Sequence, residues 1–385
     1  MMKRREFLAG AGGSLVGAAG LSTARVSFAA AAGEKKSAEP SHTPEVMRYL
    51  ERIYANDRRA YACRATNPEA HAAWREEARP VLKRMLGLDR MEQELGGWPP
   101  DVRLDEPEAL DGYTRAKGEM ITEPDVSVPF YLLRPPGTGP FPLAVMPHGH
   151  GPLGQYAAIY KSDKDKEKIL REDRDVGVQA VKRGYVVITP ATRGLGCPGV
   201  PDINNRHDNR DCRSQMIHCL LAGRTAQGER VWDMARFIDW GSTLEGVNAA
   251  RILMMGNSGG GVVTLYATAC DTRITVGVAS CSFSSFIRAD GTVQLCDCNL
   301  VPGTLTFGDA EDIAGLIAPR WFLAVHGAKD GLFILDDVKR TAVRTREVFA
   351  AAGVADHFDM RVGPEGHRFY KNLMWPFVDK AMDAA

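Results

Sequence analysis

The sequence has no excess of charge of either sign, because its 48 lysines and arginines are matched by 48 aspartates and glutamates in 385 residues. A chain of zero net charge gives no electrostatic reason to bind nucleic acid or an anionic surface. It also has no internal repeat and no HExxH motif, with which a helix presents two histidines to zinc. The balanced charge predicts no nucleic-acid partner. The length of the chain allows one large α/β domain plus an appendage.

The apolar stretch near the N-terminus is too short and too rich in glycine to span a membrane. Arg4 and Arg5 stand before Phe7, and a Gly- and Ala-rich stretch then runs to about residue 30. Paired arginines of this kind are typical of signals that export folded bacterial proteins, and the alanines at 29–32 suit a cleavage site. We therefore predict a twin-arginine signal peptide over residues 1–30 that contacts the twin-arginine export machinery. The mature protein is expected in the periplasm or outside the cell, without a membrane span; an uncleaved flexible tail is the alternative.

The cysteines all follow this N-terminal segment, where an oxidising compartment permits disulfides whose pairing the sequence does not specify. The pair His148 and His150 lacks a third ligand, and one cluster matches no usual zinc spacing: His207, Cys212, His218 and Cys219. We therefore predict no metal ion and no cofactor. The eight cysteines are Cys63, Cys197, Cys212, Cys219, Cys270, Cys281, Cys296 and Cys298.

A serine stands in a glycine-rich pentapeptide between two apolar runs. The pentapeptide is Gly256-Asn257-Ser258-Gly259-Gly260, after an apolar run at 252–255 and before another at 262–267. We interpret the first run as a buried strand and the second as a buried helix. A GxSxG sequence in this setting is a nucleophile elbow, in which the serine is strained and the glycines let strand and helix approach closely. Ser258 is the predicted nucleophile, and an ordinary glycine-rich turn is the alternative.

Two candidate partners follow this serine in the order acid, then histidine. Asp330 comes after the apolar run 321–326, and His367 comes after the strand-like run 358–362. Both fall in loops at the carboxyl ends of strands, and such loops of a parallel sheet can bring distant residues together. A serine hydroxyl needs a base, and the base needs an acid to fix its tautomer. We predict Ser258, His367 and Asp330 as nucleophile, base and acid.

Other acids compete with Asp330 for this role. Asp297 and Asp309 follow an earlier strand and stay open as alternatives. Asp336 and Asp337 stand where a helix is expected to begin, and we predict that they cap it.

Acyl transfer at a serine also needs donors for the negative charge that develops on the carbonyl oxygen. In a nucleophile elbow one donor is the amide after the serine, here Gly259, and another comes from the loop after an earlier strand. The apolar run 143–146 predicts that strand, and residues 147–151 are the loop. We predict the backbone N–H groups of His150 and Gly259 as the oxyanion hole, with either glycine of the loop as an alternative to His150.

These motifs resemble the α/β-hydrolase superfamily and, within it, the group of dienelactone hydrolases and acetyl xylan esterases. The resemblance covers about residues 110–385, with matching segments at 147–151, 183–190, 193–194, 231–234, 256–261, 318–320, 326–330 and 363–367. Dienelactone hydrolases use a cysteine nucleophile, so Ser258 implies a serine esterase, acting on short acyl groups such as acetyl on a carbohydrate. A prolyl-oligopeptidase-like peptidase or amidase is the alternative enzyme, although too few residues precede 110 for a propeller domain. A catalytically silent binding protein of the same fold is the other alternative.

The chain is predicted to fold in three parts. A signal peptide covers 1–30, a helical extension with its linker covers 31–110, and the catalytic domain covers 111–385. Apolar residues at helical spacing over 44–95 predict the helices, and the Pro- and acid-rich residues 96–110 predict the linker.

The catalytic domain is expected to begin with two strands, at 112–122 and 127–134. Strands and helices then alternate, which predicts an α/β fold with a mostly parallel, doubly wound sheet and helices on both faces. Residues 194–226 and 281–312 break the alternation, and insertions of this kind shape the pocket. The side chains expected to pack in the pocket wall are Phe283, Phe286, Leu295 and Phe307.

Overall fold

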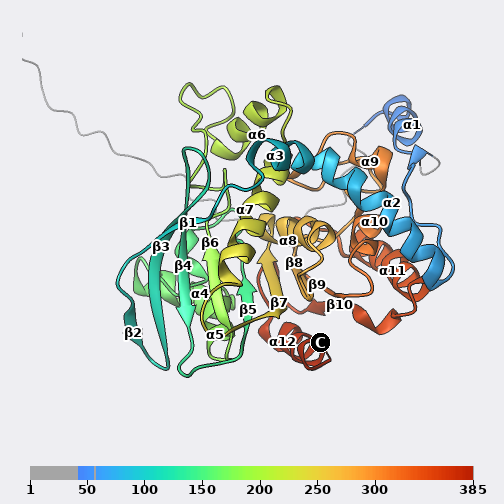
Figure 1. The fold of residues 1–385 in the computed structure, drawn as a ribbon. Coiled ribbons are helices and arrows are strands. Elements are labelled where there is room, and N and C mark those ends of the chain that lie inside the picture. Colours follow the sequence, from blue (N-terminus) through green and yellow to red (C-terminus); the bar gives the residue numbers. More distant parts are fainter. Residues whose placement is uncertain (1–41, 56–57, 385) are drawn as a thin grey trace, which may run out of the picture. The chain divides into compact units, whose positions relative to one another are not determined.

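A mixed sheet of ten strands forms the centre of the structure (Figure 1). The computed structural model describes residues 42–55 and 58–384, so the predicted signal peptide lies outside the described residues. The strands are β1 (Asp101–Leu104), β2 (Glu108–Leu110), β3 (Tyr113–Glu123), β4 (Val126–Arg134), β5 (Phe141–Val145), β6 (Val186–Pro190), β7 (Val247–Asn257), β8 (Val276–Ser280), β9 (Trp321–Gly327) and β10 (Phe358–Gly363).

The strands lie in the order β1-β3-β4-β6-β5-β7-β8-β9-β10, and β2 pairs with β3. Pairing is antiparallel from β1 to β6 and parallel from β6 through β5 to β10. The strands predicted at 112–122 and 127–134 are confirmed as β3 and β4. Because parallel strands end at one edge of a sheet, the loops after β5, β7, β9 and β10 all open at the same edge. Every predicted site residue lies in or next to one of these loops.

Helices cover both faces of the sheet, because each central strand is apolar on both sides. On β7, Ile252 and Met254 face one hydrophobic core, beneath the helices at 68–86, 88–95, 226–241 and 259–270, whereas Leu253 and Met255 face the other, beneath the helices at 176–181 and 371–383. Among the described residues, no helix is long and apolar enough to cross a membrane. The helices are α1 (Pro44–Ile53), α2 (Pro68–Leu86), α3 (Leu88–Leu95), α4 (Asp163–Arg171), α5 (Val176–Val181), α6 (Asp211–Leu221), α7 (Ala226–Gly241), α8 (Gly259–Cys270), α9 (Thr304–Phe307), α10 (Ala310–Gly315), α11 (Leu335–Ala351) and α12 (Lys371–Asp383), with short 3₁₀ helices η2 (Leu153–Gln155), η3 (Asp297–Asn299) and η4 (Ala355–His357).

The helices predicted over 44–95 are confirmed as α1, α2 and α3. The start of α2 follows from its sequence, because Asn67 accepts a hydrogen bond from the Ala70 N–H at 2.8 Å and a proline follows it. The linker predicted over 96–110 is wrong, because β1 and β2 lie there and pair with β3. Most side chains of β1 and β2 are exposed, and an outer strand tolerates the polar composition that suggested a linker.

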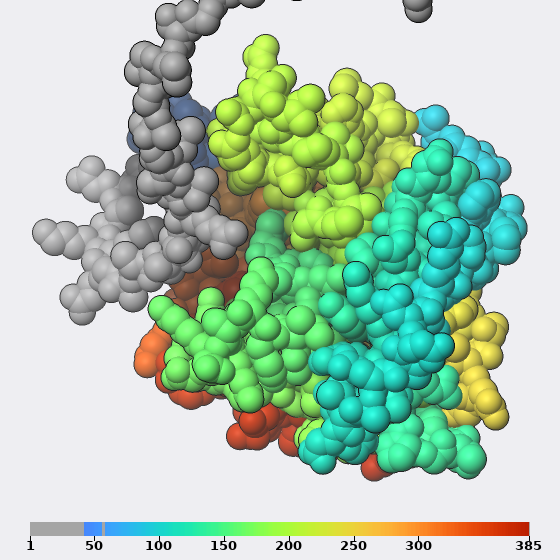
Figure 2. Space-filling view, turned by 90° about the vertical axis from the view of Figure 1, so that its left-hand side faces the viewer, coloured from blue at the N-terminus to red at the C-terminus, as the bar shows by residue number. Residues whose placement is uncertain are grey.

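Two insertions stand at the carboxyl edge of the sheet. One follows β6 and contains α6, and the other follows β8 and contains η3 and α9. Figure 2 shows the α6 insertion as the light-green surface at the top of the face in view. Because α6 packs against η3, the two insertions meet.

Candidate active site

Ser258 has the backbone conformation of a nucleophile elbow. β7 ends at Asn257, α8 begins at Gly259, and Ser258 between them has φ 58° and ψ −127°. A non-glycine residue at positive φ carries strain of roughly 1–3 kcal/mol and persists where its surroundings enforce it. The Ser258 N–H donates to the Ser280 carbonyl at 2.8 Å, so the neighbouring strand β8 holds the strained residue in place.

The glycines around Ser258 allow close backbone approach. A Cβ on Gly260 would lie 2.1 Å from the Pro147 carbonyl oxygen. A Cβ on Gly149 would lie 3.0 Å from the Ser258 Cβ and 3.1 Å from the Gly259 nitrogen. The loop after β5 therefore runs directly alongside the elbow, where the sequence predicts the second oxyanion donor.

Backbone amides beside the serine are free to donate. Within residues 42–55 and 58–384, neither the Gly259 N–H nor the His150 N–H forms a hydrogen bond, whereas the Gly151 N–H donates to the Gly149 carbonyl at 2.8 Å. This bond removes Gly151 from the alternatives. The assignment of His150 and Gly259 as the oxyanion hole stays a prediction.

Asp330 and His367 meet in the loops after β9 and β10. His367 Nδ1 lies 2.8 Å from Asp330 Oδ2, and Asp330 Oδ1 accepts from the Leu332 N–H at 2.9 Å. A carboxylate at Nδ1 keeps the ring proton on Nδ1 and leaves Nε2 free to act as a base. Among the described residues no hydrogen bond joins Ser258 to His367, and bonds of this type often tighten only with substrate bound.

The carboxyl group of Asp330 stays ionised at neutral pH. Burial by itself raises the pKa of Asp330, but the hydrogen bond and charge of His367 and the Leu332 amide hold that pKa below its ordinary value. The neighbouring His326 is buried, and burial lowers its pKa to about 4, so its ring is neutral. Asp330 can therefore stabilise a positive charge on His367 without competition from His326.

Arg174 connects the histidine loop to the elbow. Its guanidinium donates to the His367 carbonyl at 2.9 Å and to Asn257 Oδ1 at 3.4 Å. Asn257 Nδ2 donates to Ser280 Oγ at 3.1 Å, and that hydroxyl donates to the Arg368 carbonyl at 3.2 Å. Sequence reasoning missed Arg174, because it lies in a charged loop that carries no motif.

The alternative acids have other partners. Asp309 is buried, forms a capping box at the start of α10 and pairs with Arg59 at 3.0 Å. Asp297 pairs with Arg213 and Arg210 of the α6 insertion. Both carboxylates are therefore committed to holding structure.

The prediction that Asp336 and Asp337 cap a helix is wrong in position. The N-cap of α11 is Ile334, which forms no side-chain cap, and both aspartates lie in the first turn. There they still interact favourably with the positive end of the helix dipole.

The phenylalanines predicted to wall the pocket lie in the core instead. Phe283 and Phe307 are fully buried, Phe286 is nearly so, and the ring of Phe283 packs edge-on against Phe322 with centroids 5.2 Å apart. That prediction was wrong because residues 281–284, directly after β8, are still buried, and Phe286 and Phe307 pack into the same core as Phe283. A cavity of about 440 Å³ contains His367, and its other lining residues are mostly charged: Arg171, Glu172, Glu365, Gly366 and Arg368.

Within the part of the chain that the structure describes, two groups of side chains could hold a metal ion. In each group the ligand atoms lie within 4.8 Å of one another. The first group consists of Cys281, Asp330 and His367, and the second of His150, Cys212, Cys296 and Cys298. All eight cysteines are free thiols. In the first group, burial raises the pKa of the Cys281 thiol to about 12, so this thiol stays protonated beside the candidate acid and base.

No family model matches the sequence. The chain is similar to "Putative hydrolase YtaP" of Bacillus subtilis (strain 168), with 27% identity over 255 residues that cover 62% of this chain and 77% of that protein.

Solved structures share the architecture at low sequence identity. A "putative acetyl xylan esterase" from Bacteroides fragilis NCTC 9343 has a TM-score of 0.67 and 17% identity, over 90% of this chain and 97% of that chain. A glucuronoyl esterase from Solibacter usitatus has a TM-score of 0.61 and 14% identity, over 84% of this chain and 97% of that chain. These likenesses confirm the predicted fold, which is that of the α/β-hydrolases.

Proposed function

We propose that this chain, which has the α/β-hydrolase fold, is an exported serine esterase with the triad Ser258, His367 and Asp330. The observation that carries the proposal is the 2.8 Å contact between His367 Nδ1 and Asp330 Oδ2, at the edge of the sheet where Ser258 is held at positive φ. A histidine and carboxylate pair alone is a common structural feature. At the same sheet edge as a strained serine between strand and helix, the pair can serve as the base and the acid that activate this serine.

The reaction follows from the roles of these groups. Ser258 Oγ attacks the ester carbonyl carbon while His367 Nε2 takes the hydroxyl proton. The bond to the alkoxy oxygen then breaks, and His367 returns the proton to the leaving alcohol. Water, activated by the same nitrogen, attacks the acyl-enzyme and releases the carboxylic acid and free Ser258. Asp330 stays ionised and orients the imidazole throughout, in agreement with its lowered pKa.

The amides of His150 and Gly259 hold the oxyanion in this scheme. Negative charge develops on the carbonyl oxygen in both tetrahedral intermediates, and each fixed donor contributes roughly 3–4 kcal/mol to the transition state. The close approach of the loop after β5 to Ser258 supports this assignment.

Short acyl esters, such as acetyl groups on a carbohydrate, are the proposed substrates. Ser258 is not among the residues that line the cavity at His367, so this part of the proposal rests on the charged residues around His367, which suit a hydroxyl-rich alcohol better than a lipid chain. The names of the two structural neighbours, an acetyl xylan esterase and a glucuronoyl esterase, support the same class.

Export through the twin-arginine route is part of the proposal. It rests on Arg4 and Arg5 and on the alanines at 29–32, which lie outside the described residues. The exported protein would then encounter its substrate in the periplasm or outside the cell.

A fluorophosphonate probe tests the nucleophile directly, because it reacts with activated serines. We expect the wild-type chain to be labelled, Ser258→Ala to be unlabelled and inactive on p-nitrophenyl acetate, and Ser242→Ala to behave as wild type. Ser242 stands at the end of α7 and serves as the matched control. An unlabelled wild-type chain would favour a silent binding protein, and label on Ser258→Ala would place the nucleophile elsewhere.

A further inference from the structure

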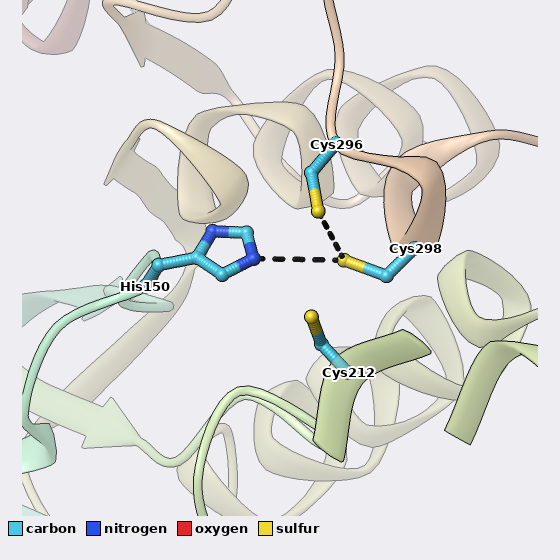
Figure 3. A group of neighbouring side chains, drawn as sticks. All are labelled: His150, Cys212, Cys296 and Cys298. Carbon is cyan, nitrogen blue, oxygen red and sulfur yellow. Dashed lines mark hydrogen bonds between the residues drawn. The ribbon is translucent and has the colours of Figure 1, made fainter. Parts of the chain in front are cut away.

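Four potential metal ligands from three separate segments converge beside the candidate oxyanion loop (Figure 3). His150 comes from the loop after β5, Cys212 from the first turn of α6, and Cys296 and Cys298 from the segment of η3. Figure 3 shows the imidazole and the three thiols pointing toward a common centre from different sides. Their ligand atoms all lie within 4.8 Å of one another.

The distances match the edges of a tetrahedron around zinc. Cys298 Sγ lies 3.6 Å from Cys296 Sγ and 3.7 Å from His150 Nε2. An ion at about 2.3 Å from each sulfur and about 2.1 Å from nitrogen separates two sulfurs by about 3.8 Å and a sulfur from the nitrogen by about 3.6 Å. Three thiols cannot all pair with one another in disulfides, whereas three thiolates and one imidazole complete a structural zinc site. We propose that His150, Cys212, Cys296 and Cys298 bind one zinc ion.

The surroundings fit a site of negative charge. Three thiolates and a divalent ion sum to one negative charge, which must be balanced when it is buried. Arg230 is fully buried next to the cluster, where its Nη1 donates to the Cys298 carbonyl at 3.0 Å. Its Nη2 is buried and has no hydrogen-bond partner among the described residues, so this arginine has a donor to spare. Leu195 and Met216 pack against the cysteines and limit the access of water.

The zinc would join both insertions to the oxyanion loop. Cys212 belongs to the insertion after β6 and Cys296 and Cys298 to the insertion after β8, while His150 also supplies a proposed oxyanion amide. A metal on Nε2 leaves the ring proton on Nδ1, and this nitrogen lies 3.5 Å from where a Cβ of Gly259 would stand. The ion therefore fixes the position of His150 against the elbow. This catalytic consequence rests on the proposed function, but the metal site does not.

The proposal revises the prediction of no metal. The short spacing of Cys296 and Cys298 is visible in the sequence, but their partners lie far away along the chain and do not form a zinc motif with them. The sequence groups Cys212 with His207, His218 and Cys219, whereas the structure places it with His150, Cys296 and Cys298.

Metal content is the first test. The full chain, purified under reducing conditions from cells supplied with zinc, is expected to hold about one zinc ion per chain by inductively coupled plasma mass spectrometry. Cys212→Ala should lose the ion and Cys212→His, which restores a ligand, should recover it. Cys197→Ser, an exposed cysteine in the same insertion, and Cys281→Ser, from the other group, should both retain it. A wild-type chain that holds no zinc and takes none up on titration would overturn the proposal, as would full zinc binding by Cys212→Ala.

Cobalt substitution tests the ligand set without relying on folded variants. Replacing zinc by cobalt in the wild-type chain should produce the intense absorption of a tetrahedral thiolate site, and an octahedral spectrum or bound iron would overturn the assignment. Removing zinc with a chelator should lower kcat on p-nitrophenyl acetate by about tenfold or more, because an oxyanion donor is loosened, and added zinc should restore it. A chain that binds zinc but cleaves no ester would refute the proposed function and leave the metal site standing.

Discussion

Replacing Asp330 by asparagine changes the group that faces His367 while keeping the size of the side chain. The carboxylate accepts at both oxygens, from His367 Nδ1 at 2.8 Å and from the Leu332 N–H at 2.9 Å. An asparagine that keeps the bond to Leu332 through its oxygen presents its NH₂ group to Nδ1. Nδ1 must then accept, so the ring proton moves to Nε2. In that tautomer His367 cannot take the proton of Ser258.

The expected loss follows from the wrong tautomer. A change of this kind in a serine triad lowers turnover by about 10⁴-fold, with the geometry otherwise intact. At 1.36 kcal/mol for each factor of ten, the activation barrier rises by about 5.5 kcal/mol. A weak activity should persist, because the serine and the oxyanion amides are still in place.

The assay is kcat on p-nitrophenyl acetate for the purified chain, with circular dichroism to verify folding. Asp359→Asn is the matched control, because Asp359 lies on β10 before His367 and pairs with Arg361 at 2.8 Å. The control should keep wild-type activity. A near-wild-type rate for Asp330→Asn would refute the reasoning, because it would mean that Asp330 is not the acid of the triad.

The same variant has a signature in stability. The pKa of Asp330 is lower in the folded chain than its ordinary value, so its ionised form contributes stability above a pH of about 4, the unfolded pKa. That contribution is lost as the pH falls through the lower, folded pKa. Melting temperature measured against pH should therefore fall more steeply on acidification for wild type than for Asp330→Asn. Identical slopes would mean that the carboxylate is not stabilised by His367.

Three further outcomes are expected. Gly260→Ala should lower the free energy of unfolding by about 1–3 kcal/mol in denaturant titrations, because its Cβ would lie 2.1 Å from a backbone oxygen; an unchanged midpoint would contradict this. Replacing Arg4 and Arg5 by lysine should leave the chain unprocessed in the cytoplasm by cell fractionation, and normal processing would indicate another export route. The chain should have a higher kcat/KM on p-nitrophenyl acetate than on the octanoate, and should cleave an acetylated oligosaccharide faster than a peptide amide; the reverse order would favour a lipase-like enzyme or a peptidase.

The parts of the site that were predictable from sequence are those fixed by local structure and by topology. The elbow is local, since Ser258 and its glycines follow one strand and precede one helix. Asp330 and His367 were predictable because each comes directly after an apolar strand, and parallel strands all end at one edge. Their mutual contact then needs no knowledge of side-chain packing.

The insertions could not be predicted in this way, because their structure depends on which distant side chains they meet. Phe283 and Phe307 are residues of a type that often lines a pocket, yet both are buried in the core. Whether an aromatic residue in an irregular segment is buried depends on the free volume beneath it, which the sequence of that segment does not encode.

His150 combines a feature that the sequence predicts with one that it does not. Its backbone position was predictable, because the strand before it and the glycines around it place it beside the elbow. Its imidazole was not, since the thiols that it faces arrive on two insertions without periodicity of their own. Four ligands that meet only after folding gain affinity from the fold, and in return they stabilise the folded state that assembles them. A metal there would fix the positions of these irregular segments, as backbone hydrogen bonds fix the strands of the sheet. It would do so beside the proposed oxyanion hole, where the transition state requires donors in fixed positions.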